Sequence, residues 1–329
     1  MKTQNLFLIL IALIACIVCN SKKTTKQKTN QAKIVKKPKR KLIKKDTVTI
    51  APNWKDKETL HLKIKKTKIQ QRSGLKQKAT SISNIEVKLK KAKNKTWEGT
   101  WAIKSIKTVA IKNPYQKKLA QLFKNFTYKF TLDSEGVVIS LNNWKEIQTK
   151  AYKAIDIMIK EMKRIPGANY ILLQNVKKSV TKLIDSKEKI ETYLMPQINL
   201  YFALGGLTIT KNDTLKATFE FVHPFTQEVA KQNLESIYKR AYTDSTCDIT
   251  LRQYIDQKEM SKIIQSTINK VANKNAVNEF NKKSRKYDLN IKSNYNISFK
   301  TGLVQKVYSK KVVSIGNDKQ IDKTVIIKL

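Results

Sequence analysis

The chain has 329 residues, of which 67 are Lys or Arg and 25 are Asp or Glu, giving a formal net charge of +42. An apolar content of 40% with 4 Trp, 12 Tyr and 10 Phe excludes a wholly disordered protein, and three cysteines exclude a disulfide scaffold. Six of the basic residues are arginine, the residue that reads bases bidentately, so the composition disfavours a nucleic-acid partner.

Residues 1–15 have the layout of a signal peptide. Lys2 supplies a positive charge before an unbroken apolar run of ten residues, Leu6 to Ala15. A membrane-spanning helix needs about twenty apolar residues, so this run is too short to span a bilayer. We therefore expect the chain to be exported.

The end of the apolar run, Leu13-Ile14-Ala15-Cys16, resembles the bacterial lipobox. The resemblance implies cleavage before Cys16 and attachment of diacylglycerol to its sulfur. The alternative is ordinary cleavage near Cys19 or Asn20, which would give a soluble secreted protein.

Residues 16–46 are predicted to form a disordered polybasic tether. Residues 22–45 contain twelve Lys or Arg and no acid, and a block of like charge stays extended. Beside a lipid anchor it would lie against an anionic membrane, where each basic residue is worth about 1 kcal/mol. The alternative is a solvated spacer. The residues expected to contact an anionic surface are Lys36, Lys37, Lys39, Arg40, Lys41, Lys44 and Lys45.

Strands dominate the sequence from residue 47 to residue 141. Apolar residues alternate with polar ones in residues 59–65, 85–89 and 97–103, which is typical of strands that face water on one side. After a short helical stretch at 115–123, strands at 126–132 and 137–141 flank the turn Asp133-Ser134-Glu135-Gly136 and predict a hairpin.

Helices are predicted next. Asn142 or Asn143 can cap a helix that ends at Pro166-Gly167, with Glu146 placed as in a capping box. A second helical region covers residues 176–193 and is broken by Pro196, and a continuation through Leu204 to Gly205-Gly206 is left open.

The last third returns to strands. They are predicted at residues 207–209, 216–222 and 246–255, followed by an amphipathic helix at 256–285. A meander of strands at 287–299, 303–315 and 324–329 ends the chain, with turns at Thr301-Gly302 and at 316–318.

The whole pattern predicts an α+β fold of antiparallel β-sheet modules with interspersed amphipathic helices. The hairpin pattern after Tyr128 is repeated after Tyr295, so the two halves could be related, with chance similarity as the alternative. We divide the body into a first module, residues 47–200, and a second module, residues 201–329.

The pattern also resembles uncharacterised exported lipoproteins of bacterial envelopes. The similarity rests on the hairpin and helix entry from Phe130 to Ile147 and on the step Pro224-Phe225, within residues 95–310. It implies an envelope location, on the periplasmic or outer-membrane face, and it supplies no catalytic residue.

No motif in the sequence specifies a reaction, a metal or a cofactor. His61 alternates with leucines on a strand and His223 precedes a proline, and neither has other ligands at metal-site spacing. Cys247 lies in a predicted strand and is interpreted as a small buried apolar residue. The carboxylates at predicted turns or strand ends, interpreted mainly as turn residues, are Asp133, Glu135, Asp244 and Asp248.

We therefore expect a non-enzymatic, membrane-anchored lipoprotein that binds or scaffolds an anionic component of the envelope. One alternative is a secreted hydrolase that uses paired carboxylates. Another is a soluble secreted anion-binding protein. The sequence leaves the oligomeric state open.

Overall fold

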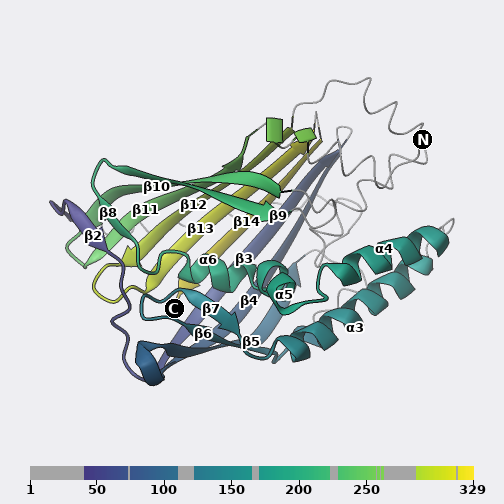
Figure 1. Cartoon of the computed structure of the whole chain (residues 1–329), viewed down its shortest axis with the longest axis horizontal. Helices are drawn as coiled ribbons and strands as arrows, with labels where there is room; N and C mark the ends of the chain where they lie inside the picture. Colours follow the sequence, from purple (N-terminus) through teal and green to yellow (C-terminus); the bar gives the residue numbers. More distant parts are fainter. Residues whose placement is uncertain are drawn as a thin grey trace, which may run out of the picture.

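The computed structural model describes residues 41–72, 75–109, 122–164, 170–222, 229–256, 258–259, 261–262, 287–315 and 318–329. In these residues one twelve-stranded sheet has the strand order β1-β10-β11-β12-β13-β14-β3-β4-β5-β6-β7, and β9 also pairs with β10 (Figure 1). Its strands are β1 (Leu42–Ile43), β3 (Glu58–Arg72), β4 (Leu75–Lys91), β5 (Trp97–Val109), β6 (Thr127–Leu132), β7 (Val138–Leu141), β9 (Thr214–Val222), β10 (Val229–Tyr242), β11 (Thr246–Ile255), β12 (Tyr287–Ser298), β13 (Val304–Ile315) and β14 (Asp318–Lys328).

A second, two-stranded sheet joins β2 (Thr47–Thr49) to β8 (Thr208–Thr210). All described strand pairs are antiparallel. The α+β prediction with antiparallel sheets is confirmed, with sheet as the main component. That the two halves are related stays a prediction.

The large sheet contains strands from both predicted modules. β14, the last strand of the chain, pairs with β13 on one side and with β3 on the other, from Lys319 opposite Gln71 to Lys328 opposite Leu62. Hydrogen bonds therefore run continuously from the second module into the first.

Most predicted strands are present, and several are longer than predicted. The β6–β7 hairpin is confirmed, and Gly136 in its turn has a φ of +84°, which glycine adopts without strain. β14 begins at Asp318, six residues before the predicted strand at 324–329. β10 was not predicted, because residues 229–242 mix polar and apolar side chains without strict alternation.

The helices differ from prediction in number and bounds. The first, α3 (Trp144–Lys163), is confirmed. The region predicted at 176–193 is two helices, α4 (Tyr170–Lys182) and α5 (Lys187–Leu194), separated by a turn before Ser186, whose hydroxyl accepts a hydrogen bond from the N–H of Lys189. Pro196 begins α6 (Pro196–Phe202), since the first turn of a helix tolerates the missing N–H.

Asn143 is the N-cap of α3, but its side chain bonds to a strand. Its Oδ1 accepts from the N–H of Lys129 at 2.9 Å, and its Nδ2 donates to the carbonyl of Thr127 at 2.9 Å and to Glu146 Oε2 at 3.0 Å. The predicted cap residue therefore joins the start of the helix to β6.

α6 lies on one face of the curved sheet, which we call the inner face (Figure 1). Tyr201 on α6 donates to the carbonyl of Val304 at 3.0 Å, and Tyr295 on β12 donates to the carbonyl of Leu200 at 3.0 Å. The Tyr201 ring meets Trp101 edge-on, with ring centres 6.0 Å apart. The core is therefore enclosed between α6 and the inner face.

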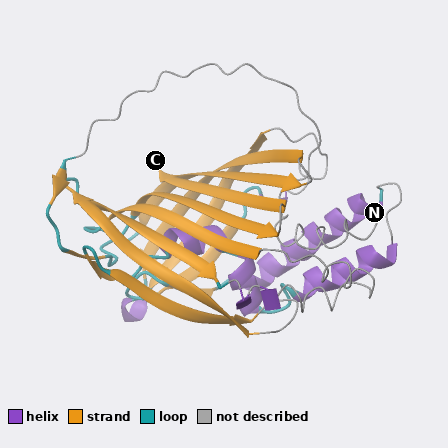
Figure 2. Ribbon diagram, turned by 90° about the horizontal axis from the view of Figure 1, so that it is seen from above, coloured by secondary structure: helices purple, strands orange, loops and turns teal. Residues whose placement is uncertain are grey.

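Alternation along each strand decides which face a side chain occupies. On β3, Leu62 and Ile64 are buried on the inner face, and His61, Lys63 and Lys65 are exposed on the opposite, outer face. This confirms the prediction that His61 belongs to the polar side of a strand. Figure 2 shows the curvature of the sheet and the α3–α4 pair lying beyond one end of it.

Several predictions fall outside the described residues. These are Cys16, Lys36, Lys37, Lys39, Arg40, His223, the Pro224-Phe225 step, most of the stretch at 115–123 and most of the helix at 256–285.

Candidate anion-binding surface

One row across the outer face consists of cations in direct register. Arg252 on β11 is paired with Lys292 on β12, Lys292 with Lys310 on β13, and Lys310 with Lys323 on β14. We call Arg252, Lys292, Lys310 and Lys323 the cation row. Neighbouring strands lie about 4.8 Å apart, so the row places positive charges side by side across four strands.

The ends of the row have different neighbours. Arg252 is in register with Glu235 on β10, and its Nη1 lies 4.0 Å from Glu235 Oε2. Lys323 is in register with Thr67 on β3, whose hydroxyl lies 3.2 Å from that of Thr80. Within the described ranges, the single acid in contact with the row therefore lies at its β10 end.

The three lysines of the row have no acidic partner in the described part of the chain. Like charges directly opposite each other destabilise a sheet, and burial elsewhere must offset that cost. The adjacent outward side chains on the same three strands are uncharged: Asn290, Asn294, Tyr308, Val312, Ile321 and Val325.

Some other cations of the outer face have acidic partners. Glu86 on β4 lies 3.1 Å from Lys104 and 3.4 Å from Lys88, and its hydrogen bond to Lys104 and both positive charges hold the pKa of Glu86 below its usual value. Arg240 lies 2.9 Å from Asp248. The lysines of the cation row differ from Lys63, Lys65 and Lys306, which also have no acidic partner in the described part of the chain, in standing directly opposite one another on neighbouring strands.

An anion on the row would supply the missing partner. Lysine presents a compact charge with three donors on a flexible stem, which suits phosphate or carboxylate groups at varied spacing. The outer face curves away from α6 (Figure 1), so a flat bilayer would touch it along a narrow line, whereas a flexible polymer can follow it.

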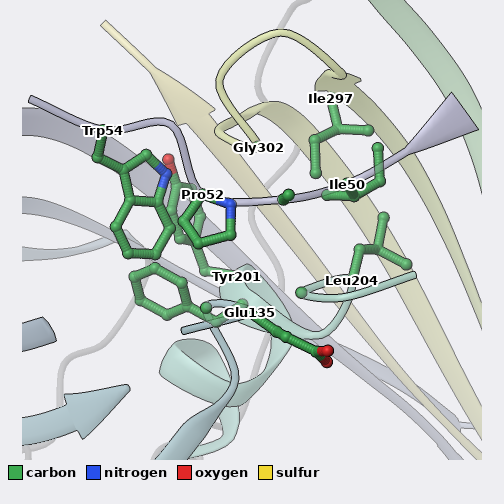
Figure 3. A pocket seen from close by; sticks show the side chains of 12 residues that line it. Ile50, Pro52, Trp54, Glu135, Tyr201, Leu204, Ile297 and Gly302 are labelled. Atoms are coloured by element: carbon green, nitrogen blue, oxygen red, sulfur yellow. The ribbon is translucent and has the colours of Figure 1, made fainter. Parts of the chain in front are cut away.

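A small cavity lies between α6 and the turn that precedes β7 (Figure 3). Its volume is about 10 Å³, the space of one water molecule. Trp54 Nε1 in its wall is buried without a hydrogen-bond partner among the described residues, and the Glu135 carboxylate points away from the Trp54 ring (Figure 3). The cavity is too small for a substrate.

A larger groove of about 280 Å³ lies between β7 and α5, and its acids have structural partners. Glu191 Oε1 accepts from the N–H of Leu141 at 2.7 Å, which satisfies a donor on the edge of the sheet. Hydrogen bonds from its own backbone and from Ser186 hold the pKa of Glu188 below its usual value. Both acids of the groove therefore take part in local hydrogen bonds.

The residues considered for catalysis occupy structural positions. Burial raises the pKa of the Cys247 thiol to about 12, and its side chain is fully buried, as predicted. Asp133 Oδ1 accepts from the N–H groups of Glu135 and Val137, both at 2.9 Å, and Asp244 Oδ1 accepts from Thr246. These bonds confirm that Asp133 and Asp244 serve turns.

Asp248 lies on the outer face of β11 rather than in a pocket. It accepts from the Tyr242 hydroxyl at 2.6 Å and from Asn296 at 3.1 Å, besides its contact with Arg240. Among the described residues, no group of three or more His, Cys, Asp and Glu side chains could hold a metal ion.

The end of the predicted tether is attached to the sheet. Leu42 and Ile43, which follow Lys41, form β1 and pair with β10. Lys44 is exposed, while Lys45 lies over the Phe299 ring at 4.8 Å and its carbonyl accepts from Tyr238. The described part of the tether thus lies along β10, away from the cation row on β11 to β14.

No protein-family model matches the chain, and no curated protein matches it. Among solved structures, the chain is similar to lipovitellin, in a study of its lipid–protein interactions, with a TM-score of 0.43 and 10% identity over 84% of this chain. DynF from the dynemicin biosynthesis pathway of Micromonospora chersina has a TM-score of 0.19 and 6% identity over 92% of each chain. The chain spans 25% of the lipovitellin chain. These TM-scores are too low to establish a shared fold.

Among the described helices, none is both long enough and apolar enough to cross a membrane.

Proposed function

We propose that the chain is a membrane-anchored, non-enzymatic protein that binds a linear polyanion of the cell envelope along the cation row. The observation that carries the proposal is the row itself, in which Lys292, Lys310 and Lys323 stand in register without acidic partners in the described part of the chain. A polymer of phosphate or carboxylate groups would neutralise the lysines and remove their mutual repulsion. Relief of that repulsion would therefore contribute to the free energy of binding.

In this proposal the two basic regions have separate tasks. The lipid on Cys16 and the tether hold the protein at a membrane, and the folded body presents the row to the aqueous side. β1 pairs with the end of β10 at Ala241 and Tyr242, and the row begins on the next strand, at Arg252 on β11. The tether and the row can therefore engage different anions at the same time.

The test compares two triple variants that remove the same charge. The row variant is Lys292→Gln, Lys310→Gln, Lys323→Gln, and the control is Lys63→Gln, Lys65→Gln, Lys306→Gln, at exposed positions on the same face. Binding of the full chain to long-chain polyphosphate is measured by calorimetry over a series of salt concentrations.

We expect the row variant to lose at least about tenfold in affinity and to show a shallower dependence on salt, since fewer counterions are released. The control should lose about threefold or less, the effect of lower net charge. Equal losses in the two variants would show that net charge alone drives binding, and this would overturn the proposal.

A further inference from the structure

The α3–α4 pair ends in an exposed apolar and basic surface far from the cation row. α3 has 20 residues and is therefore about 30 Å long, and the pair extends beyond the end of the sheet (Figures 1 and 2). Its near end is fixed to the body: Ile147 is fully buried, and Gln148 Nε2 donates to the carbonyl of Ile184 at 2.8 Å.

At the far end, α4 begins with two exposed apolar side chains. Ile171 is 73% exposed and Tyr170 is 59% exposed, whereas Leu173, one turn further along α4, is 4% exposed. Tyr170 and Ile171 therefore lie off the face that packs against α3. Apolar side chains exposed to this extent at the end of a projecting element are candidates for contact with another surface.

Cations surround this apolar end. Lys163 Nζ lies 4.3 Å from the centre of the Tyr170 ring, and Lys160 lies one turn before Lys163 on α3. Residues 160–164 contain Lys160, Lys163 and Arg164 against the single acid Glu161, a net charge of +2. Glu161 lies 3.0 Å from Arg164.

We propose that this end of the α3–α4 pair is a peripheral membrane contact, in which Ile171 and the Tyr170 ring enter the interface of an anionic bilayer and Lys160 and Lys163 meet its headgroups. An aromatic ring with a polar tip and lysines with apolar stems are the side chains that prefer the boundary between water and lipid. Their charge is opposite to that of an anionic leaflet.

A membrane fits this surface better than a protein partner does. A specific protein interface buries roughly 1,000 Å² or more with matched shape, far beyond two side chains at the end of a helix pair. A bilayer demands no matched shape, and a basic patch combined with inserted apolar groups is sufficient for reversible binding. The contact is independent of the lipid on Cys16, and it would fix the orientation of a body that the tether alone leaves free to rotate.

The experiment measures insertion at one position at a time. An environment-sensitive NBD fluorophore is attached to Ile171→Cys, or as the control to Leu329→Cys, in the full chain with Cys19→Ser. Leu329 is 70% exposed, similar to Ile171, but it lies at the C-terminus beside His61, to whose carbonyl its N–H donates. Cys247 is fully buried and does not compete for the label.

Vesicles of phosphatidylcholine with phosphatidylglycerol as the minor component are then added. We expect NBD emission at position 171 to rise at least about threefold and to be quenched by nitroxide-labelled lipid, as for a probe that enters the interface. Emission at position 329 should stay constant, although the lipid anchor and tether bring both probes to the same vesicle. Equal responses at the two positions, or none at 171, would overturn the proposal.

A second variant tests the role of the apolar side chain itself. NBD placed at Lys160→Cys should report insertion, and adding Ile171→Glu should abolish the increase, because a carboxylate resists entry into the interface. Ile171 is exposed, so the substitution should leave the thermal unfolding temperature and the polyphosphate affinity unchanged. A full NBD increase in the Ile171→Glu chain would contradict the assignment.

Discussion

Tyr201 and Tyr295 are buried and hold α6 against the sheet, and Tyr128 is partly buried on β6; all three should make the stability of the fold depend on alkaline pH. Burial raises the pKa of Tyr128 to about 12 and raises those of Tyr201 and Tyr295 further in the same direction. In the unfolded chain each tyrosine titrates near 10. Below pH 10 each tyrosine is neutral in both the folded and the unfolded chain, so its full contribution to the unfolding free energy is present. Above pH 10 the unfolded chain releases the proton first, and for Tyr128 this contribution is lost as the pH rises from about 10 towards 12.

The comparison of the wild-type chain with Tyr128→Phe isolates this effect, because lysine deprotonation changes both proteins alike. We expect the wild type to lose up to about 1.4 kcal/mol of unfolding free energy per pH unit relative to the variant above pH 10. Urea unfolding at a series of pH values measures this difference. A difference that stays constant across the series would show that Tyr128 ionises in the folded state as in water.

At the scale of elements, Asn143 is the joint between α3 and β6. We expect Asn143→Ala to lower the unfolding free energy by about 1–3 kcal/mol, because the N–H of Lys129 loses its acceptor and two donated hydrogen bonds disappear. Asn142→Ala is the matched control, since its side chain bonds only to the exposed Thr131 hydroxyl among the described residues. Urea denaturation should show a much smaller loss for the control, and equal losses would contradict the role of Asn143.

The same element shows how far local pattern predicts structure. The sequence placed the cap at Asn142 or Asn143, because both asparagines precede an apolar pattern of helical spacing, and the structure has Asn143 there. It did not indicate the partners of the cap, because Thr127 and Lys129 reach Asn143 through the packing of the helix on the hairpin. Pro196 was interpreted as the break of a helix, but it begins α6. A proline is excluded from a helix interior but fits the first turn, so the local sequence alone is compatible with either position.

The cation row was not predictable from the sequence. The predicted turn at 316–318 and the predicted strand at 324–329 left Lys323 outside a strand, whereas in the structure Ile315 is opposite Asp318 and Lys310 is therefore opposite Lys323. The pairing of Lys292 with Lys310 depends on a register shift between Asn296 and Ile297, which no local pattern indicates. The step from β11 to β12 crosses more than thirty residues of chain, so Arg252 could be placed in the row only by the structure.

At the scale of the whole molecule, β14 should make the two predicted modules unfold together. It pairs with β13 and with β3 along most of its length, so neither side can lose its strands without exposing the other. The four tryptophans, Trp54, Trp97, Trp101 and Trp144, all report on the first module, and the buried thiol of Cys247 reports on the second.

We expect urea titrations followed by tryptophan fluorescence and by Cys247 labelling to have the same midpoint in a chain with Cys16→Ser and Cys19→Ser. Two separate midpoints would mean that residues 47–200 and 201–329 are independent domains. The polyanion and membrane contacts proposed above would then lie on bodies free to move apart.

The place of β14 also sets an order of events during synthesis. β3 is complete after about a fifth of the chain has been made, yet the neighbour that covers its free edge consists of residues 318–328. That edge must therefore wait, open to pairing with a second copy, until residues 318–328 have been made. A nascent chain that stalls before residue 318 should be an aggregating species, and a chain crossing a membrane from its N-terminus can finish its sheet only after residues 318–328 have followed.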